Sequence, residues 1–456
     1  MTLHDAKRIH IVGIGGIGIS ALGKWALEQG KVVSGSDVKE NQLTLWLQHH
    51  GAVISIGPHT ANNVPEDCDL LLYSVATEPG NPERRSAERR SIDFLSYPQA
   101  LDQLLQGKVG IAVAGTHGKS TTTAMLAHVL IHAKRDPSVI VGTRVRLFGD
   151  TNERLGKGQE FILEADEYNQ GILLYHPTHA IVLNVDREHV DIYPTLQDSQ
   201  HAFQTFASHI LPSGSLTLNA DDPSLELLRS ASAAPVQTFG FTKADLVGSN
   251  IHVTPTGTTF TVAGLYTGTV QLQVYGAHNV QDALAVLCVA HRLGIPFEIA
   301  RDALAEFPGT WRRFERRGTW RGATIIDDYG HHPTELAATI DAARQVFPGQ
   351  RLVVVFQPHT HSRTIAFAEQ FAIVLRRADA VVMTDVYDVP GRERGPEADV
   401  PAIVQSIGQL ATYVHTVPDA VAKIASIVQP NDVILTIGAG DITTFYDLAQ
   451  KENPKP

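Results

Sequence analysis

The amino-acid sequence predicts an α/β protein of three domains. Its 456 residues are enough for about three domains, and short β-branched runs alternate with helical stretches as in βαβ units. Two glycine-rich loops, about one hundred residues apart, each follow a strand-like run and open a helix. We therefore expect an N-terminal Rossmann-like domain (1–106), a central P-loop domain with a β-rich excursion (107–316) and a C-terminal Rossmann-like domain (317–456).

The predicted elements follow this order along the chain. In the first domain we expect strands at His10–Val12, Val32–Ser34 and Leu70–Tyr73. The second should contain strands at Val109–Ala114, Phe161–Leu163 and Ala180–Asn184, and helices at Thr122–Ala133 and Asp282–Leu293. Between them, residues Val236–Tyr275 are rich in Thr, Val and Gly, which favours antiparallel hairpins. The third should have strands near Ala323–Asp327, Leu352–Phe356, Ala380–Thr384 and Val433–Ile437.

Composition and charge exclude several classes of partner. The net charge of −11 argues against binding to nucleic acid or to an anionic membrane, because both require many Lys and Arg contacts. No apolar stretch approaches the roughly 20 residues of a membrane helix, and no signal-peptide pattern opens the sequence. The two cysteines, Cys68 and Cys288, have no paired spacing. We expect a cytoplasmic protein without a membrane partner.

The first glycine loop predicts a nucleotide-binding N-terminal domain. It reads Gly13-Ile-Gly15-Gly16-Ile-Gly18, follows a strand, opens a helix, and is followed by Asp37. Backbone N–H groups at such a helix start bind a diphosphate, and an acidic residue at this spacing accepts a hydrogen bond from a ribose hydroxyl. The pattern does not specify NAD, and a glycine turn selected for packing is the alternative.

The second glycine loop predicts an ATPase-like central domain. Its residues are Gly115, Thr116, His117, Gly118, Lys119, Ser120 and Thr121. Backbone N–H groups would hold the phosphates, Lys119 would neutralise their charge, and the Ser120 hydroxyl would bind Mg²⁺. Val113 stands where the full P-loop pattern has its first glycine, so a chance occurrence is the alternative.

Two acidic stretches follow strands of the central domain. They read Glu164-Ala-Asp166-Glu167-Tyr168 and Asn184-Val-Asp186-Arg-Glu188-His189. Strands of a parallel sheet end at one edge, so both stretches should lie beside the phosphate loop. Their oxygen atoms suit Mg²⁺. A solvated acidic loop is the alternative.

The full set of motifs resembles the Mur ligases of peptidoglycan synthesis. The remaining members of the set are Gly276-Ala-His278-Asn279, Phe307-Pro-Gly-Thr-Trp-Arg312-Arg313-Phe314 and Asp327-Asp328-Tyr329-Gly-His331-His332-Pro333. The resemblance runs in order from Gly13 to Gly440. It implies an ATP- and Mg²⁺-dependent ligase that joins an amino acid to the carboxylate of UDP-N-acetylmuramate through an acyl phosphate. The stretch Gln357-Pro-His359, with Arg363, is most similar to the branch that adds L-alanine.

The resemblance also implies roles for individual residues. ATP contacts would come from the second glycine loop together with His278, Asn279, Arg313 and Asp328. The metal ligands would be Ser120, Glu164 and His189. UDP would be held by Gly13, Gly15, Gly16, Gly18, Ser36 and Asp37. The amino acid would lie among Tyr329, His331 and Arg363, and the catalytic residues would be Lys119, His331 as a base, and Arg363 as a carboxylate anchor.

Several alternatives stay open at the level of sequence. The chain could be the recycling ligase that attaches a murein tripeptide to UDP-N-acetylmuramate, a nucleotide-binding oxidoreductase, or a binding protein that has lost catalysis. Asn169–Ile172 and Thr360 differ from the usual family pattern, so the identity of the added amino acid stays open. The sequence does not reveal the oligomeric state.

Overall fold

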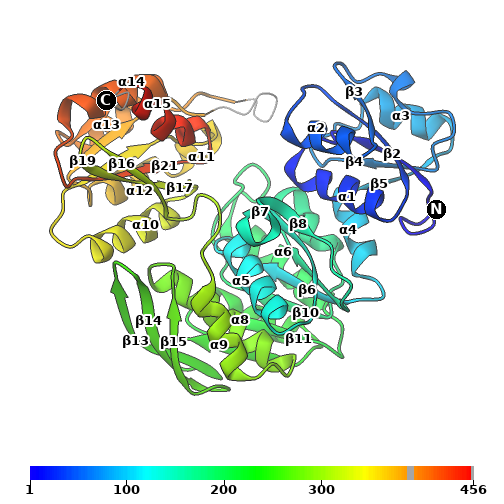
Figure 1. Cartoon of the computed structure of the whole chain (residues 1–456), viewed down its shortest axis with the longest axis horizontal. Helices are drawn as coiled ribbons and strands as arrows, with labels where there is room; N and C mark the ends of the chain where they lie inside the picture. The colour runs from blue at the N-terminus through cyan, green and yellow to red at the C-terminus, as the bar shows by residue number, and fades with distance from the viewer. Residues whose placement is uncertain (388–394, 453–456) are drawn as a thin grey trace.

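The computed structural model describes residues 1–387 and 395–452, apart from the side chain of Asn169. The chain forms three α/β domains, each built on its own sheet, as predicted (Figure 1). Gly13 follows a strand of the first sheet and Lys119 follows a strand of the second, so the two glycine loops belong to different domains.

The N-terminal domain has a parallel five-stranded sheet in the order β3-β2-β1-β4-β5. Its strands are β1 (Arg8–Val12), β2 (Val32–Asp37), β3 (Val53–Ile56), β4 (Leu70–Tyr73) and β5 (Asp93–Ser96). Its helices are α1 (Ile17–Glu28), α2 (Gln42–His49), α3 (Pro82–Arg89) and α4 (Tyr97–Leu105). The first glycine loop joins the central strand β1 to α1, at the carboxyl edge of the sheet.

The central domain is organised around a ten-stranded sheet in the order β15-β14-β13-β12-β11-β10-β6-β9-β7-β8. The first strands are β6 (Val109–Ala114), β7 (Ser138–Val145), β8 (Thr151–Arg154), β9 (Glu160–Glu164) and β10 (His179–Val182). The others are β11 (Ser215–Asn219), β12 (Val236–Gly240), β13 (Leu246–Thr254), β14 (Gly257–Gly264) and β15 (Gly268–Leu272). The helices are α5 (Lys119–His132), α6 (Leu196–Ser208), α7 (Glu226–Ala231), α8 (Ala277–Arg292) and α9 (Phe297–Glu306).

The C-terminal domain has a six-stranded sheet in the order β16-β17-β21-β18-β19-β20, in which only β16 runs antiparallel to its neighbour. Its strands are β16 (Glu315–Trp320), β17 (Ala323–Asp328), β18 (Leu352–Phe356), β19 (Ala380–Met383), β20 (Ala411–Tyr413) and β21 (Val433–Ile437). Its helices are α10 (Pro333–Val346), α11 (His361–Ala366), α12 (Ala368–Leu375), α13 (Val400–Ile407), α14 (Val417–Ile427) and α15 (Phe445–Glu452).

One local prediction is wrong in part. Residues Val236–Tyr275 were expected to form antiparallel hairpins, but β12 pairs in parallel with β11 and continues the main sheet. Only β13, β14 and β15 form the antiparallel excursion. β12 lies between β11 and β13 in the sheet, and its Phe239 is buried in the core. The helix predicted from Asp282 begins earlier, at Ala277, directly after Gly276.

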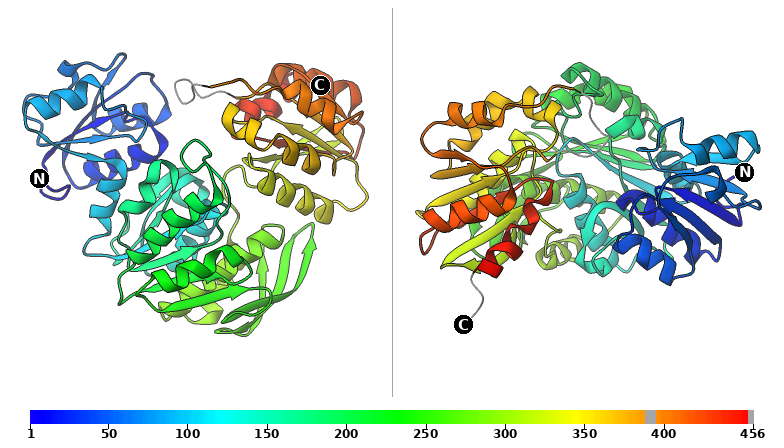
Figure 2. Two further views of the ribbon diagram at one scale, coloured as in Figure 1. Left: turned by 180° about the vertical axis from the view of Figure 1, so that it is seen from behind. Right: turned by 90° about the horizontal axis from the view of Figure 1, so that it is seen from above.

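The three domains surround a common region (Figures 1 and 2). The N-terminal domain contacts the central domain through α1 and β7, and the buried Lys24 of α1 donates to Glu153 of β8 over 3.0 Å. The C-terminal domain approaches the central domain with α10. Among residues 1–387 and 395–452, no helix is long and apolar enough to span a bilayer.

Candidate active site

The phosphate loop lies between β6 and α5 and requires both of its glycines. Gly115 and Gly118 have φ values of +132° and +86°, in the region that disfavours other residues. A Cβ atom on Gly118 would lie 2.6 Å from a carboxylate oxygen of Asp282. The side chain of Asn184 holds the loop from outside: its oxygen accepts from the His117 N–H over 2.8 Å and its amide donates to the His117 carbonyl over 3.1 Å. The loop is therefore preformed, with the N-terminus of α5 available to an anion.

Lys119 extends back over this loop toward three carboxylates. Its Nζ donates to the carbonyls of Gly115 and Thr116, over 2.8 Å and 3.2 Å, and to Glu167 Oε2 over 2.8 Å. Burial by itself lowers the pKa of Lys119, but the charges of Glu167, Asp166 and Glu164 raise it above its ordinary value. The loop thus carries a permanent positive charge at a nearly buried position.

Oxygen ligands lie on either side of Lys119. The Ser120 hydroxyl donates to Glu164 over 2.9 Å, and Glu164 also accepts from the Gly142 N–H over 2.6 Å. On the other side, ligand atoms of Asp166, Glu167 and His189 all lie within 4.8 Å of one another. The predicted metal ligands are therefore divided: Ser120 and Glu164 form one group, whereas His189 is grouped with Asp166 and Glu167.

His189 is suited to ligate a cation. It has a left-handed backbone, with φ at 49°, and its Nδ1 is buried without a hydrogen-bond partner among the described residues. Burial lowers the pKa of His189 to about 4, so the imidazole is neutral near pH 7. A buried, neutral and unpartnered nitrogen beside carboxylates is the form in which histidine binds a metal.

Two cavities meet at the phosphate loop. A cavity of about 300 Å³ is lined by Thr121, His278, Asn279, Phe314 and Asp328, and a larger one of about 450 Å³ contains Lys119, Glu164 and His189. Both are bordered by His117, Gly118, Arg313 and Glu335. A nucleoside in the smaller cavity would therefore present its phosphates to the larger one across the loop.

Adjacent arginines in the linker to the C-terminal domain have different environments. Arg312 is 1% exposed and pairs with Asp327 over 2.8 Å, so it holds the start of the third domain together. Arg313 lines both cavities and donates to Glu335 over 3.3 Å. Asp328 accepts from the backbone N–H groups of Phe314 and Gly330, over 2.8 Å and 2.7 Å. The linker thus directs Arg313 alone toward the ligand space.

The C-terminal domain contributes Tyr329, His331 and Arg363 to the larger cavity. Burial, with the charge of Arg363, lowers the pKa of His331 to about 4, so its ring is neutral near pH 7 but is a weaker base than an ordinary imidazole. Arg363 is 4% exposed, which rules out a surface position. Its Nε donates to Glu188 of the central domain over 2.9 Å, and its Nη1 lies 3.1 Å from His359 Nδ1. The predicted carboxylate anchor already holds a carboxylate, from another domain.

Only part of the N-terminal glycine loop lines the larger cavity. Gly16 and Gly18 line it, whereas Gly13 and Gly15 lie deeper in the turn. The Gly15 N–H donates to the Asp37 carboxylate over 2.8 Å. The Ser36 hydroxyl is fully buried and donates to Glu83 over 2.8 Å, so it belongs to an internal network. The roles of Ser36 and Asp37 as UDP contacts stay predictions.

Comparison with known proteins agrees with these features over the whole chain. Family models for Mur ligases match residues 8–109 (Mur ligase family, catalytic domain), 113–290 (Mur ligase middle domain) and 312–440 (Mur ligase, glutamate ligase domain). The chain is 40% identical to the UDP-N-acetylmuramate–L-alanine ligase of Salinibacter ruber, covering 96% of this chain and 93% of that protein. The chain belongs to the Mur ligase family.

Further relatives support the same membership. A UDP-N-acetylmuramate–L-alanine ligase of Aquifex aeolicus is 38% identical, with 98% of each chain covered. The crystal structure of UDP-N-acetylmuramate-alanine ligase from Thermotoga maritima superposes with a TM-score of 0.81 at 31% identity, covering 98% of this chain and all of that one. A murein peptide ligase from Psychrobacter arcticus superposes less well, with a TM-score of 0.72 at 25% identity over 98% of each chain.

Two residues of this Mur ligase site have roles that the sequence did not predict. Asn184 was predicted only as part of a possible Mg²⁺-binding stretch, but in the structure its side chain fixes the phosphate loop. Glu335 accepts from Arg313 and from the His331 N–H, over 3.3 Å and 2.9 Å, where the central and C-terminal domains meet. The sequence His332-Pro-Thr-Glu335 is a capping-box pattern and could have indicated that Glu335 turns back over the start of α10.

Proposed function

We propose that this Mur ligase is an ATP-dependent, ADP-forming ligase that joins L-alanine to the carboxylate of UDP-N-acetylmuramate, in peptidoglycan precursor synthesis. The observation that carries the proposal is the pair of cavities joined at the phosphate loop, because the smaller could hold a nucleoside and the larger the reacting groups, with Lys119 in the larger cavity and Arg313 bordering both. Near-complete alignment with ligases of this name supports the choice of substrates.

The reaction requires activation of a poor acyl donor. A carboxylate oxygen of UDP-N-acetylmuramate attacks the γ-phosphorus of ATP, and ADP leaves with the electron pair of the broken P–O bond. The amine of alanine then attacks the acyl carbon and phosphate leaves, while the amine loses a proton. Lys119 and Arg313 border the space where negative charge develops in the first step, and fixed cations there stabilise it.

The second step requires a neutral amine. His331 lines the same cavity, and we assign to it the role of the base that accepts the proton lost by the amine. We place the alanine carboxylate near Arg363, where binding would compete with Glu188 for the guanidinium. Tyr329 borders the same space.

We propose Mg²⁺ as the cation of this site. Ser120 and Glu164 would hold one ion through their oxygen atoms, which suit a hard divalent cation, and the buried Nδ1 of His189, beside Asp166 and Glu167, would be a ligand of a second. When bound, the ion neutralises phosphoryl charge.

ATP contacts would come from residues 115–121 and from His278, Asn279, Arg313 and Asp328. UDP would lie against Gly13, Gly15, Gly16 and Gly18, with Ser36 and Asp37 behind the loop. We place the domain boundaries near residues 106 and 316; β16 begins at Glu315, so the second boundary falls at the start of this strand. Consumption of ATP is consistent with activity in the cytoplasm.

The test is the release of phosphate from ATP with UDP-N-acetylmuramate and each amino acid in turn. We expect release with L-alanine and a product heavier by one alanyl residue in mass spectrometry. Activity only with a murein tripeptide would indicate the recycling ligase instead. Quenching of tryptophan fluorescence by NADH, but not by UDP, would indicate an oxidoreductase.

A further inference from the structure

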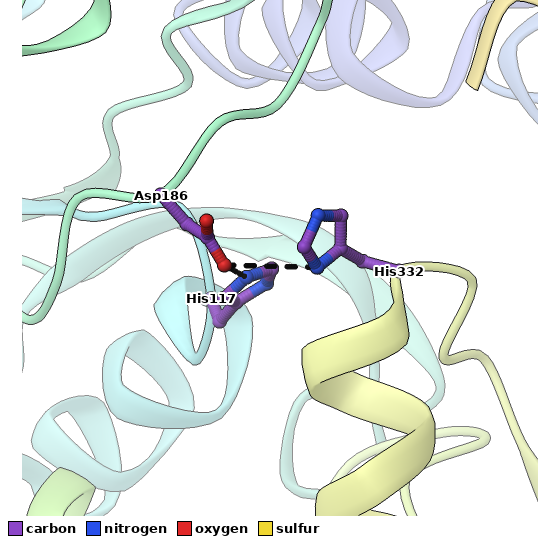
Figure 3. A group of neighbouring side chains, drawn as sticks. All are labelled: His117, Asp186 and His332. Atoms are coloured by element: carbon purple, nitrogen blue, oxygen red, sulfur yellow. Dashed lines mark hydrogen bonds and ion pairs between the residues drawn. The ribbon is translucent and has the colours of Figure 1, made fainter. Parts of the chain in front are cut away.

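A cluster of two histidines and an aspartate joins the central and C-terminal domains beside the phosphate loop. His117 belongs to that loop, Asp186 follows β10, and His332 is the residue that caps α10 (Figure 3). His117 Nε2 lies 3.2 Å from Asp186 Oδ2, and His332 Nδ1 lies 3.7 Å from the same oxygen. The three ligand atoms are all within 4.8 Å of one another.

We propose that His117, Asp186 and His332 form a binding site for a divalent transition-metal ion such as Zn²⁺, separate from the proposed Mg²⁺ site and in addition to the ligase reaction. Two imidazole nitrogens and one carboxylate oxygen favour Zn²⁺, Co²⁺ or Ni²⁺ over Mg²⁺, which prefers oxygen ligands. Bonds of about 2.0–2.2 Å in a tetrahedral site place ligand atoms about 3.3 Å apart. The observed spacings approach this value, so small side-chain rotations complete the site.

The surroundings hold the Asp186 carboxylate in place, whereas each histidine must exchange a hydrogen bond for the ion. The lone pair of His332 Nδ1 accepts from the Thr334 N–H over 3.3 Å, and His117 Nε2 donates to Asp186 Oδ2, so a bound ion would replace both bonds. The other oxygen of Asp186 accepts from the Arg187 N–H over 2.7 Å, which fixes the carboxylate while Oδ2 points at both rings. Hydrogen bonds to the outer atoms of metal ligands are typical of sites that hold their geometry without the ion.

An ion bound at this cluster would lie beside the smaller cavity and between two domains. His117 and Asp186 line the smaller cavity, so a fourth ligand could come from water or from a phosphate oxygen. His117 and Asp186 belong to the central domain and His332 to the C-terminal domain. An ion bound to all three would hold these domains in the arrangement of Figure 1.

The test is calorimetric titration of the full chain with ZnCl₂ after removal of metals by a chelator, without nucleotide. We expect a Zn²⁺ site whose affinity falls at least about tenfold in His332→Asn and in Asp186→Asn. Asparagine is a good helix N-cap, so His332→Asn removes the ligand and keeps the start of α10. Thermal melting of each variant, followed by circular dichroism, verifies that it folds.

Glu164→Gln is the matched control, because it alters the proposed Mg²⁺ site and leaves the cluster intact. It should bind Zn²⁺ like the unaltered chain. Titration with CoCl₂ gives a second readout: the visible d–d bands should indicate a tetrahedral site in the unaltered chain and in Glu164→Gln, and weaken in His332→Asn. No binding of Zn²⁺, equal binding by His332→Asn, or loss only in Glu164→Gln would each overturn the proposal.

Discussion

The two glycine loops of this protein follow the same local design but have different charges. Each joins a strand of a parallel sheet to a helix, β1 to α1 and β6 to α5. The first turn of α1 contains no charged residue, and the loop before it is held by a carboxylate, Asp37, that accepts from the Gly15 N–H. The second loop carries Lys119, surrounded by three carboxylates.

This difference in charge implies different roles: the first loop binds a ligand, and the second loop promotes its reaction. Backbone N–H groups and a helix start bind a diphosphate in its ground state. A fixed ammonium in a nearly buried cavity stabilises charge that develops as a phosphoryl group is transferred. The comparison therefore predicts that changes in the second loop affect turnover and that changes in the first affect the affinity for the nucleotide sugar.

The largest expected effect is that of Lys119→Ala. Loss of a charged contact to a transferring phosphoryl group costs about 3–4 kcal/mol, so kcat should fall by at least about a hundredfold. The dissociation constant for UDP-N-acetylmuramate, measured by calorimetry, should change little because the sugar nucleotide is proposed to lie on the other loop. The exposed Lys157→Ala is the matched control and should keep both constants. An equal loss of sugar-nucleotide affinity in Lys119→Ala would contradict the separation of roles.

The next effect concerns Arg363, which belongs to neither loop. Arg363→Ala should raise the KM for alanine at least tenfold with little change in the KM for ATP, because a desolvated charge partner is worth about 2–5 kcal/mol. The substitution also leaves Glu188 buried without its partner, which destabilises the fold.

The double variant Arg363→Ala/Glu188→Gln separates the two causes. It should recover thermal stability but keep the high KM for alanine. If the KM returns to normal together with the stability, Arg363 holds Glu188 only and does not hold the substrate.

A third expectation is that the surroundings of the second loop make the protein sensitive to acid. Burial lowers the pKa of His189 and of His331 to about 4, below the ordinary value of about 6.5. Between these values the two histidines bind protons in the unfolded chain but not in the folded chain, so their contribution to the free energy of unfolding should fall as the pH falls. Each histidine contributes up to about 1.4 kcal/mol per pH unit.

Denaturant titrations of the unaltered chain and of His331→Asn, from pH 7 to pH 4.5, measure this slope. The free energy of unfolding of the variant should depend less steeply on pH. Identical slopes would show that His331 does not contribute.

Most of the fold could be predicted from the sequence, because strands and helices are indicated by patterns of neighbouring residues. β4 and β6 match their predicted bounds because each is a short buried run next to a turn, whereas β1 begins two residues before the predicted His10 and β10 ends two residues before the predicted Asn184. The course of β12 could not be predicted, since its Thr- and Val-rich composition suits either strand direction and the choice depends on its partner β11.

The parts of the site that belong to sequence motifs could be predicted. Lys119, Glu164, His189 and Arg363 do line one cavity. The pairing of Arg363 with Glu188 joins residues far apart in sequence and in different domains. Such contacts depend on how the domains meet, and no local pattern encodes them. Thr360, which departs from the family pattern, is buried directly before α11, three residues before Arg363.

The smallest expected effect tests the first loop. In Asp37→Asn the side chain can still accept from the Gly15 N–H, but without its charge, and charge-assisted hydrogen bonds are roughly twice as strong as neutral ones. We expect a loss of about 1 kcal/mol, which is about a fivefold increase in the dissociation constant for UDP-N-acetylmuramate. The kcat at saturating substrates should stay the same, because the loop does not contact the transferring phosphoryl group in the proposed arrangement. Calorimetry gives the affinity and steady-state assays give kcat. A fall in kcat without a change in affinity would mean that the first loop takes part in the chemistry, and the contrast between the two loops would no longer hold.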